Sequence, residues 1–215
     1  MIFLPVGCLI FILFILALPV LFVLGYFHIM TIGFEKLGIS PQLTIFLLLA
    51  ILIGSSINIP LGRKKLVYVE ESRFFGLWKT PKVEAHGIAI NLGGAVIPIL
   101  LSLYFLTKVP LEPVLTATVL MIVISKFISR VVPDKGVSIP ALMPPVFSAI
   151  FALILAPQFA ALCASISGVL GVLIGADLLN LRKIQKSGGF IAIGGAGVFD
   201  GIFLVGIVSA LLAGF

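Results

Sequence analysis

The chain of 215 residues is 61% hydrophobic and only 10% charged, with a formal net charge of +6. This composition excludes a soluble globular domain and indicates a polytopic membrane protein. Because the positive charge is spread over short links between apolar stretches, it bears on membrane topology, and no nucleic-acid partner is expected. The first apolar stretch has neither a charged leader nor a cleavage site, so we expect a retained helix.

A helix that spans a bilayer needs about 20 predominantly apolar residues. By this rule the sequence predicts an all-α bundle of about seven transmembrane helices in a single domain, 1–215. In chain order the predicted helices are 2–26, 43–59, 87–106, 113–129, 139–156, 159–181 and 190–215. The fifth contains Pro140, Pro144 and Pro145, so it either spans the membrane or re-enters it.

The basic residues predict how the seven helices are oriented across the membrane. Almost all of the 14 Lys and Arg residues lie on or beside the links that follow the second, fourth and sixth helices. The positive-inside rule places these links in the cytoplasm, and we expect both termini to be extracytoplasmic in a cytoplasmic membrane. The long polar stretch 61–86 is therefore predicted to be a cytoplasmic loop, in which 65–70 alternates like a short strand.

Two aspartates lie inside apolar, glycine-rich stretches near the end of the chain, Asp177 and Asp200. A carboxylate in the hydrocarbon layer costs about 3 kcal/mol or more, so such residues face a protein interior or a wet cavity. At 1.5 Å per residue, Asp177 lies about 7 Å before Arg182, and Asp200 lies about 8 Å from the cytoplasmic edge if the helix 190–215 ends at the far edge of a layer about 30 Å thick. Two carboxyl groups at one depth on adjacent helices are expected to meet.

If these carboxyl groups meet, they cannot both ionise, and one shared proton supplies an acid and a base together. Aspartic proteases use this arrangement to activate water and protonate a carbonyl group without a metal. Two other interpretations stay open. One is a proton or ion pathway, and the other is a structural role as helix caps or ion-pair partners.

Several glycines accompany the aspartates. Ser167, Gly171 and Gly175 recur every four residues and predict a small-residue face for close helix packing. Gly197 and Gly201 flank the second aspartate and allow backbone to approach its carboxyl group closely. We count Gly175, Gly197 and Gly201 among the residues that would position a substrate.

Other catalytic groups are not indicated. His28 and His86 have no companions at the spacing of metal ligands, so neither a metal nor a cofactor is expected. The chain has no serine in a nucleophile-elbow sequence and no glycine-rich phosphate-binding motif. Asp177 and Asp200 are therefore the candidate catalytic residues.

The sequence around both aspartates is similar to a family of uncharacterised prokaryotic membrane proteins of unknown function. The similarity is carried by Gly-Ala-Asp177-Leu-Leu-Asn-Leu and by Gly-Gly-Ala-Gly-Val-Phe-Asp200-Gly-Ile-Phe-Leu. It extends upstream through Ile59-Pro-Leu-Gly-Arg63, Asn91-Leu-Gly-Gly-Ala-Val-Ile-Pro98 and Ser138-Ile-Pro-Ala-Leu142. It thus covers most of the chain after the first predicted helix.

More remotely, the arrangement of two aspartates on adjacent membrane helices resembles that of the intramembrane aspartyl proteases presenilin, signal peptide peptidase and prepilin peptidase. These enzymes carry one aspartate on each of two adjacent helices near the cytoplasmic face. The resemblance implies a presenilin-like arrangement in which Asp177 and Asp200 hydrolyse a membrane-embedded peptide, while Pro140, Ala141 and Leu142 hold its unwound segment. In this chain the Pro-Ala-Leu tripeptide precedes both aspartates, and neither aspartate follows Gly-x-Gly.

Two further functions fit the same residues. A proton-coupled transporter or channel would use both carboxyl groups, with discontinuous helices at 194–197 and 140–145. A membrane module without turnover would use them only for structure. The sequence therefore leaves a hydrolase, a transporter and a non-catalytic module as alternatives.

Overall fold

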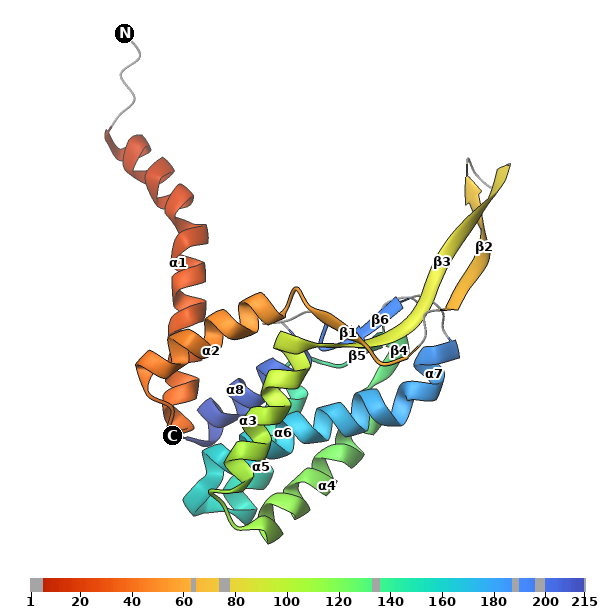
Figure 1. The fold of residues 1–215 in the computed structure, drawn as a ribbon. Helices are drawn as coiled ribbons and strands as arrows, with labels where there is room; N and C mark the ends of the chain where they lie inside the picture. The colour runs from red at the N-terminus through yellow and green to blue at the C-terminus, as the bar shows by residue number, and fades with distance from the viewer. Residues whose placement is uncertain are drawn as a thin grey trace.

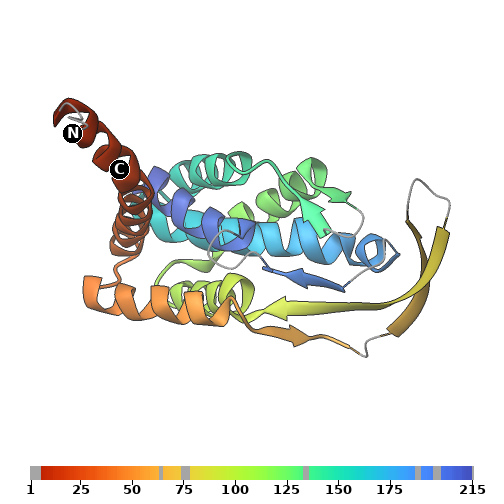
Figure 2. The same ribbon diagram turned by 90° about the horizontal axis from the view of Figure 1, so that it is seen from above.

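The computed structural model describes residues 6–62, 65–73, 78–132, 136–186, 190–195 and 200–214. These residues form a mostly helical bundle with strands gathered at one end, and a long N-terminal helix projects from the bundle (Figure 1, Figure 2). The described part contains seven helices of ten residues or more. The predicted order of the helices is therefore confirmed, whereas their bounds change at the end where the strands lie.

Three helices are long and apolar enough to cross a membrane, as expected for a multi-pass protein. They are Phe11–Lys36 within α1 (Val6–Lys36), α4 (Leu111–Ile128) and the continuous stretch Pro157–Gln185. The last of these changes its winding along its length. Its segments are η2 (Pro157–Phe159, 3-10), α6 (Ala160–Val172), η3 (Leu173–Asp177, π), η4 (Leu178–Asn180, 3-10) and α7 (Leu181–Lys186).

The remaining apolar helices are shorter than the sequence predicts. They are α2 (Pro41–Gly54), α3 (Ile97–Leu106, preceded by the π-helix η1, Leu92–Val96), α5 (Met143–Leu155) and α8 (Gly201–Ala213). In each case a strand lies in the chain on the side where the helix is shorter. β1 (Asn58–Pro60) follows α2, β3 (Trp78–Asn91) precedes η1, β5 (Gly136–Ser138) precedes α5, and β6 (Phe190–Ile193) precedes α8.

The expectation of an all-α bundle is therefore wrong at one end, where 58–59, 87–91 and 190–193 are strands and not helix. The physical reason is that a short apolar run suits a buried strand as well as a helix. Backbone groups near the bilayer must be paired within the protein, and strand pairing meets that requirement.

The strand β3 is the centre of the sheet. β2 (Lys65–Arg73) pairs antiparallel with its first part, and β1 pairs antiparallel with its end, Asn58 opposite Asn91. On the other side of β3, β6 pairs parallel with Gly87–Ile90. The expected short strand at 65–70 is confirmed as part of β2, which with β3 makes the long ribbon of Figure 1.

The three links that carry most basic residues lie together at this end. β4 (Arg130–Val132) pairs with β5, and β5 contacts β6, which in turn pairs with β3. The links after α2, after α4 and after α7 therefore meet, as expected for links on one face of the membrane.

Small residues let α6 occupy the centre of the bundle, between α4, α5 and α8. Gly171 packs against Met121 of α4, and Gly175 packs against the Ile122 carbonyl of α4, each leaving no room for a Cβ atom. Gly206 of α8 approaches α6 in the same way. The predicted small-residue packing face is confirmed for the two glycines of this helix.

The far end of the bundle bears on the expected topology. Lys36 Nζ donates a hydrogen bond of 2.7 Å to the Gly214 carbonyl oxygen, so α1 and α8 end side by side (Figure 1). If α1 and the bundle both cross the membrane, α1 begins on the face opposite to the end of α8. The expectation of two extracytoplasmic termini is also inconsistent with a path of seven crossings, because an odd number of crossings places the two ends of a chain on opposite faces.

Candidate functional site

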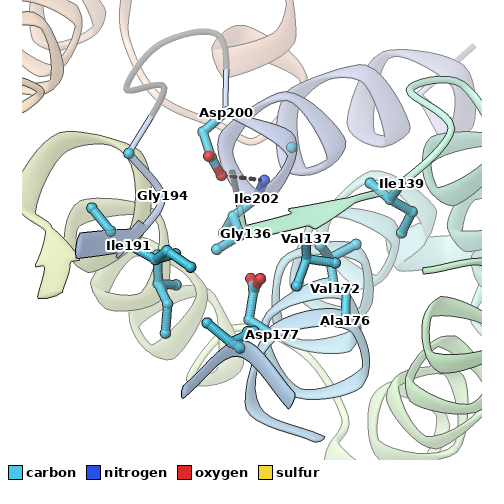
Figure 3. Close-up of a pocket in the computed structure, with 15 residues that line it drawn as sticks. Gly136, Val137, Ile139, Val172, Ala176, Asp177, Ile191, Gly194, Asp200 and Ile202 are labelled. Carbon is cyan, nitrogen blue, oxygen red and sulfur yellow. Dashed lines mark hydrogen bonds between the residues drawn. The ribbon is translucent and has the colours of Figure 1, made fainter. Parts of the chain in front are cut away.

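Asp177 and Asp200 line the same pocket, at the end of the bundle where the strands lie. The pocket has a volume of about 350 Å³, and the two carboxyl groups point into it from opposite sides (Figure 3). They are close enough to interact electrostatically. The structure thus brings together the two residues that the sequence singled out.

Asp177 reaches the pocket from the irregular end of the α6 helix. It is the last residue of the π-helix η3, and the next residues wind as the tighter 3-10 turn η4. Asp177 precedes η4 without capping it, since its side chain accepts no hydrogen bond from that turn. Single-turn π segments inside helices are often associated with functional sites.

Asp200 reaches the pocket from the start of α8. Its Oδ1 atom accepts a hydrogen bond of 2.9 Å from the Ile202 backbone N–H, so Asp200 is the N-cap of that helix (Figure 3). The interpretation as a helix cap is therefore correct for Asp200, although its carboxyl group also faces the pocket. The same interpretation fails for Asp177.

Strands and turns form part of the walls of the pocket, beside helical residues such as Val172, Ala176 and Ile184. On one side lie the residues of β6 and the turn after it, Ile191, Ala192, Ile193, Gly194 and Gly195. On the other side lie β5 and the residue that follows it. The turn after β6 contains Gly194, whose φ of 74° favours glycine. Gly194 packs so closely against Ala95 that a Cβ atom on Gly194 would overlap Ala95.

A second pocket, of about 570 Å³, adjoins the first. It shares Val137, Ile139, Asp200 and Gly201 with the first pocket, and its remaining lining is mainly apolar, including Ala141, Pro144 and Leu204. Asp200 therefore lines both the pocket that contains the second carboxyl group and a pocket with mainly apolar walls.

The tripeptide predicted to hold a substrate is only partly at the site. Ala141 lines the second pocket together with Asp200. Pro140 and Leu142 are exposed, and Leu142 is exposed to 72%. The tripeptide thus lies at the outer edge of the second pocket, just before α5.

The predicted glycines fall into three situations. Gly201 lines both pockets, as expected for a residue that lets backbone approach a carboxyl group. Gly175, in η3, packs against α4 and lines neither pocket. Gly197 lies outside the described residues.

Other groups around the site were missed from sequence. Lys126, Ser129 and Asn180 form a hydrogen-bonded cluster behind Asp177. Asn180 lies in the 3-10 turn η4 that follows the π-helix η3, so its direction is not the one that a regular helix would give. Among the described residues no group of three His, Cys, Asp or Glu side chains is placed to hold a metal ion.

A protein-family model described as "Protein of unknown function (DUF1614)" matches residues 52–212. The chain belongs to the DUF1614 family. The matched part contains both aspartates and every residue that lines the two pockets around them, whereas α1 lies outside it. No curated protein and no solved structure matches the chain, so the resemblance of this DUF1614 protein to intramembrane proteases stays a prediction.

Proposed function

We propose that the protein is an intramembrane hydrolase of the aspartyl-protease type, in which Asp177 and Asp200 cleave a peptide bond of a membrane-embedded segment. The observation that carries the proposal is the entry of both carboxyl groups into one pocket from opposite sides. A carboxyl pair that shares a proton offers a base and an acid at the same place. Such a pair hydrolyses an amide without a metal.

The contacts of the two aspartates suggest different roles. Asp200 accepts a hydrogen bond from the Ile202 N–H and stands at the N-terminus of α8, where the helix dipole favours negative charge. Asp177 has no such capping bond. Asp200 is therefore assigned as the carboxylate, and Asp177 carries the shared proton.

The reaction then balances without further groups. The Asp200 carboxylate takes a proton from water, the water oxygen bonds to the scissile carbonyl carbon, and Asp177 gives its proton to the carbonyl oxygen. The resulting diol collapses as the C–N bond breaks. The nitrogen takes the proton from Asp200, Asp177 takes one back from a hydroxyl group, and the products are an acid and an amine. The pair returns to its starting protonation.

The surroundings of the pair indicate the substrate class. Asp200 also lines the second, mainly apolar pocket, together with Ala141 and Leu204. Apolar side chains of a membrane-embedded peptide suit such a wall. The peptide must be unwound at the scissile bond, because the peptide groups inside a helix are hydrogen-bonded and shielded. With the basic links inside, the pair lies toward the cytoplasmic face of a cytoplasmic membrane.

A specific observation favours a proton-coupled transporter as the second candidate. Asp200 lines two pockets, and buried serines lie in the packed helices α5, α6 and α8. Ser148 and Ser209 both approach Gly168 of α6. Carboxyl and hydroxyl groups in series are typical of proton pathways.

One set of measurements separates the two candidates. The purified full chain in liposomes is incubated with transmembrane peptides, and the products are identified by mass spectrometry. The hydrolase cleaves at least one peptide in the presence of EDTA, and hydroxyl-containing transition-state analogues stop the cleavage. Proton movement in sealed vesicles, with no peptide cleaved and no effect of the analogues, would replace the hydrolase with the transporter.

A further inference from the structure

The strongest unassigned feature lies directly behind Asp177, between the end of α4 and the irregular part of the α6 helix. Lys126 Nζ donates hydrogen bonds to the Leu179 carbonyl oxygen at 2.8 Å and to Asn180 Oδ1 at 2.6 Å. Asn180 Nδ2 donates to Ser129 Oγ at 2.9 Å and to the Ala176 carbonyl oxygen at 2.8 Å. Three of these side-chain hydrogen bonds join the end of α4 to the α6 helix, and the fourth, to Ala176, lies within the α6 helix.

The directions of these bonds are mutually consistent. The Ser129 hydroxyl accepts from Asn180 and donates in turn to the Lys126 carbonyl oxygen at 3.0 Å. Because Lys126 can only donate, it must face the amide oxygen of Asn180, and the amide nitrogen is then turned toward its two acceptors. Asn180 is only 4% exposed, so this orientation is not exchanged for water contacts.

The cluster holds the backbone on both sides of Asp177. The Ala176 carbonyl belongs to the peptide group that contains the Asp177 nitrogen, so the bond from Asn180 fixes the peptide plane immediately before the aspartate. The bond from Lys126 fixes the Leu179 carbonyl two residues after it. The direction of the Asp177 side chain depends on these two peptide planes.

This segment needs such support. The π and 3-10 turns around Asp177 have poorer hydrogen-bond geometry than a regular helix. Near a bilayer, a carbonyl group left unpaired is costly. Gly175 adds a close backbone contact with α4 just before the same segment.

We propose that Lys126, Asn180 and Ser129 form a brace that holds the distorted end of the α6 helix against α4 and directs the Asp177 carboxyl group at Asp200, with Lys126 as the principal positioning residue. The proposal deepens the proposed function. Its expected effect on kcat rests on the hydrolase activity proposed above. Its geometric part concerns the relative placement of two side chains and is measured without any reaction.

The test compares Lys126→Met, which keeps the length of the side chain and removes its donors, with Lys126→Arg, which keeps donors. Lys108→Met is the matched control, because Lys108 lies on the α3–α4 link over the Tyr104 ring, away from the cluster. In the hydrolase assay Lys126→Met lowers kcat by about 100-fold, the size expected for an ångström-scale misplacement, with KM unchanged. Lys126→Arg recovers part of the loss, and Lys108→Met retains full activity.

The geometric measurement uses Asp177→Cys/Asp200→Cys in a background with Cys8 and Cys163 replaced by Ala. A short bis-methanethiosulfonate reagent joins the two positions, and Lys126→Met slows this cross-linking several-fold, whereas Lys108→Met does not. Ser129→Ala gives a smaller slowing in the same direction and replaces Lys126→Met if that variant does not fold. Cross-linking and kcat unchanged in folded brace variants would overturn the proposal. Slowed cross-linking in a protein that cleaves nothing would support the brace and reject only the hydrolase.

Discussion

Ile88 of β3 lies opposite Ile191 of β6 in a parallel pair, and this register aligns two segments of identical sequence, Ile-Ala-Ile. A helix capped by a side chain follows each segment. Asn91, directly after the first segment, accepts a hydrogen bond from Gly94 N–H at 2.8 Å, and Asp200 accepts one from Ile202 N–H. The order differs, because Gly-Gly-Ala lies inside the first helix η1 but precedes the cap of the second helix. Only the second cap carries a carboxyl group into the pocket.

The turn that follows the second Ile-Ala-Ile segment gives the first prediction. Gly194 has a φ of 74°, and a Cβ atom there would overlap Ala95 and the backbone beside it. Gly38 has a φ of 76° with nothing within 4 Å of a Cβ atom, so it is a matched control for backbone strain alone. We expect Gly38→Ala to cost about 1–2 kcal/mol of stability, the penalty for a left-handed residue with a side chain.

We expect Gly194→Ala to cost more, by about 1–3 kcal/mol of overpacking, and to reduce activity because the turn forms a wall of the pocket. Thermal melting in detergent and the activity of the folded fraction measure the two effects. Equal melting temperatures for the two variants would show that the contact with Ala95 contributes nothing.

The sequence predicted the pocket better than it predicted the fold around it. Asp177 and Asp200 were recognisable because ionisable residues in apolar stretches are rare, and their placement in one pocket follows from helix lengths. The strands were missed because Ile88–Ile90 and Ile191–Ile193 were counted as the ends of helices, although their alternation is also that of a strand. The identical tripeptides were a signal in the sequence for pairing between them.

The cluster around Lys126 was beyond sequence reasoning for a different reason. Regular helical geometry turns Asn180 toward the side of Asp177, whereas the π-helix before it and its own 3-10 turn bring it against α4. Deviations of winding within a helix depend on tertiary packing, and Gly175, which approaches α4 closely, lies in this π segment. No periodic pattern in the sequence encodes them.

The second prediction concerns the contact between α4 and α6. Gly171 lies against Met121 with no space for a methyl group, whereas Gly25 of α1 has nothing within 4 Å of a Cβ atom. Gly171→Ala is expected to lower stability by about 1–3 kcal/mol through overpacking, and Gly25→Ala to change it by about 0.5 kcal/mol or less. A similar melting temperature for both variants would contradict the close packing of the two helices.

The third prediction concerns topology. Single cysteines at Lys65, Arg130 and Lys183, placed in the three links at the sheet end, are expected to react with a membrane-impermeant thiol reagent only from the cytoplasmic side. Cysteines at Ser40 and Lys108, on links at the other end, are expected to react only from outside. A tag before α1 is expected in the cytoplasm and a tag after α8 outside, since α1 and α8 end together. Labelling of either set from the wrong side would reverse or reject this arrangement.

The fourth prediction separates the two roles of Asp200, as a helix cap and as half of the carboxyl pair. Asn is as good an N-cap as Asp, so Asp200→Asn keeps the bond to Ile202 N–H and the stability of α8. Asp200→Ala loses the cap and costs about 1 kcal/mol. Asp177→Asn removes a carboxyl group that caps no helix and is expected to leave the protein folded.

Activity follows a different order from stability. If the two carboxyl groups share one proton, each needs the other, so Asp177→Asn, Asp200→Asn and the double variant are expected to lose turnover to about the same extent. Asp200→Ala is expected to be as inactive as Asp200→Asn although it is less stable. Melting temperature and turnover measured on these four variants decide the matter. Full activity in Asp177→Asn or Asp200→Asn would end the hydrolase proposal, and activity that falls only with melting temperature would leave Asp200 as a helix cap alone.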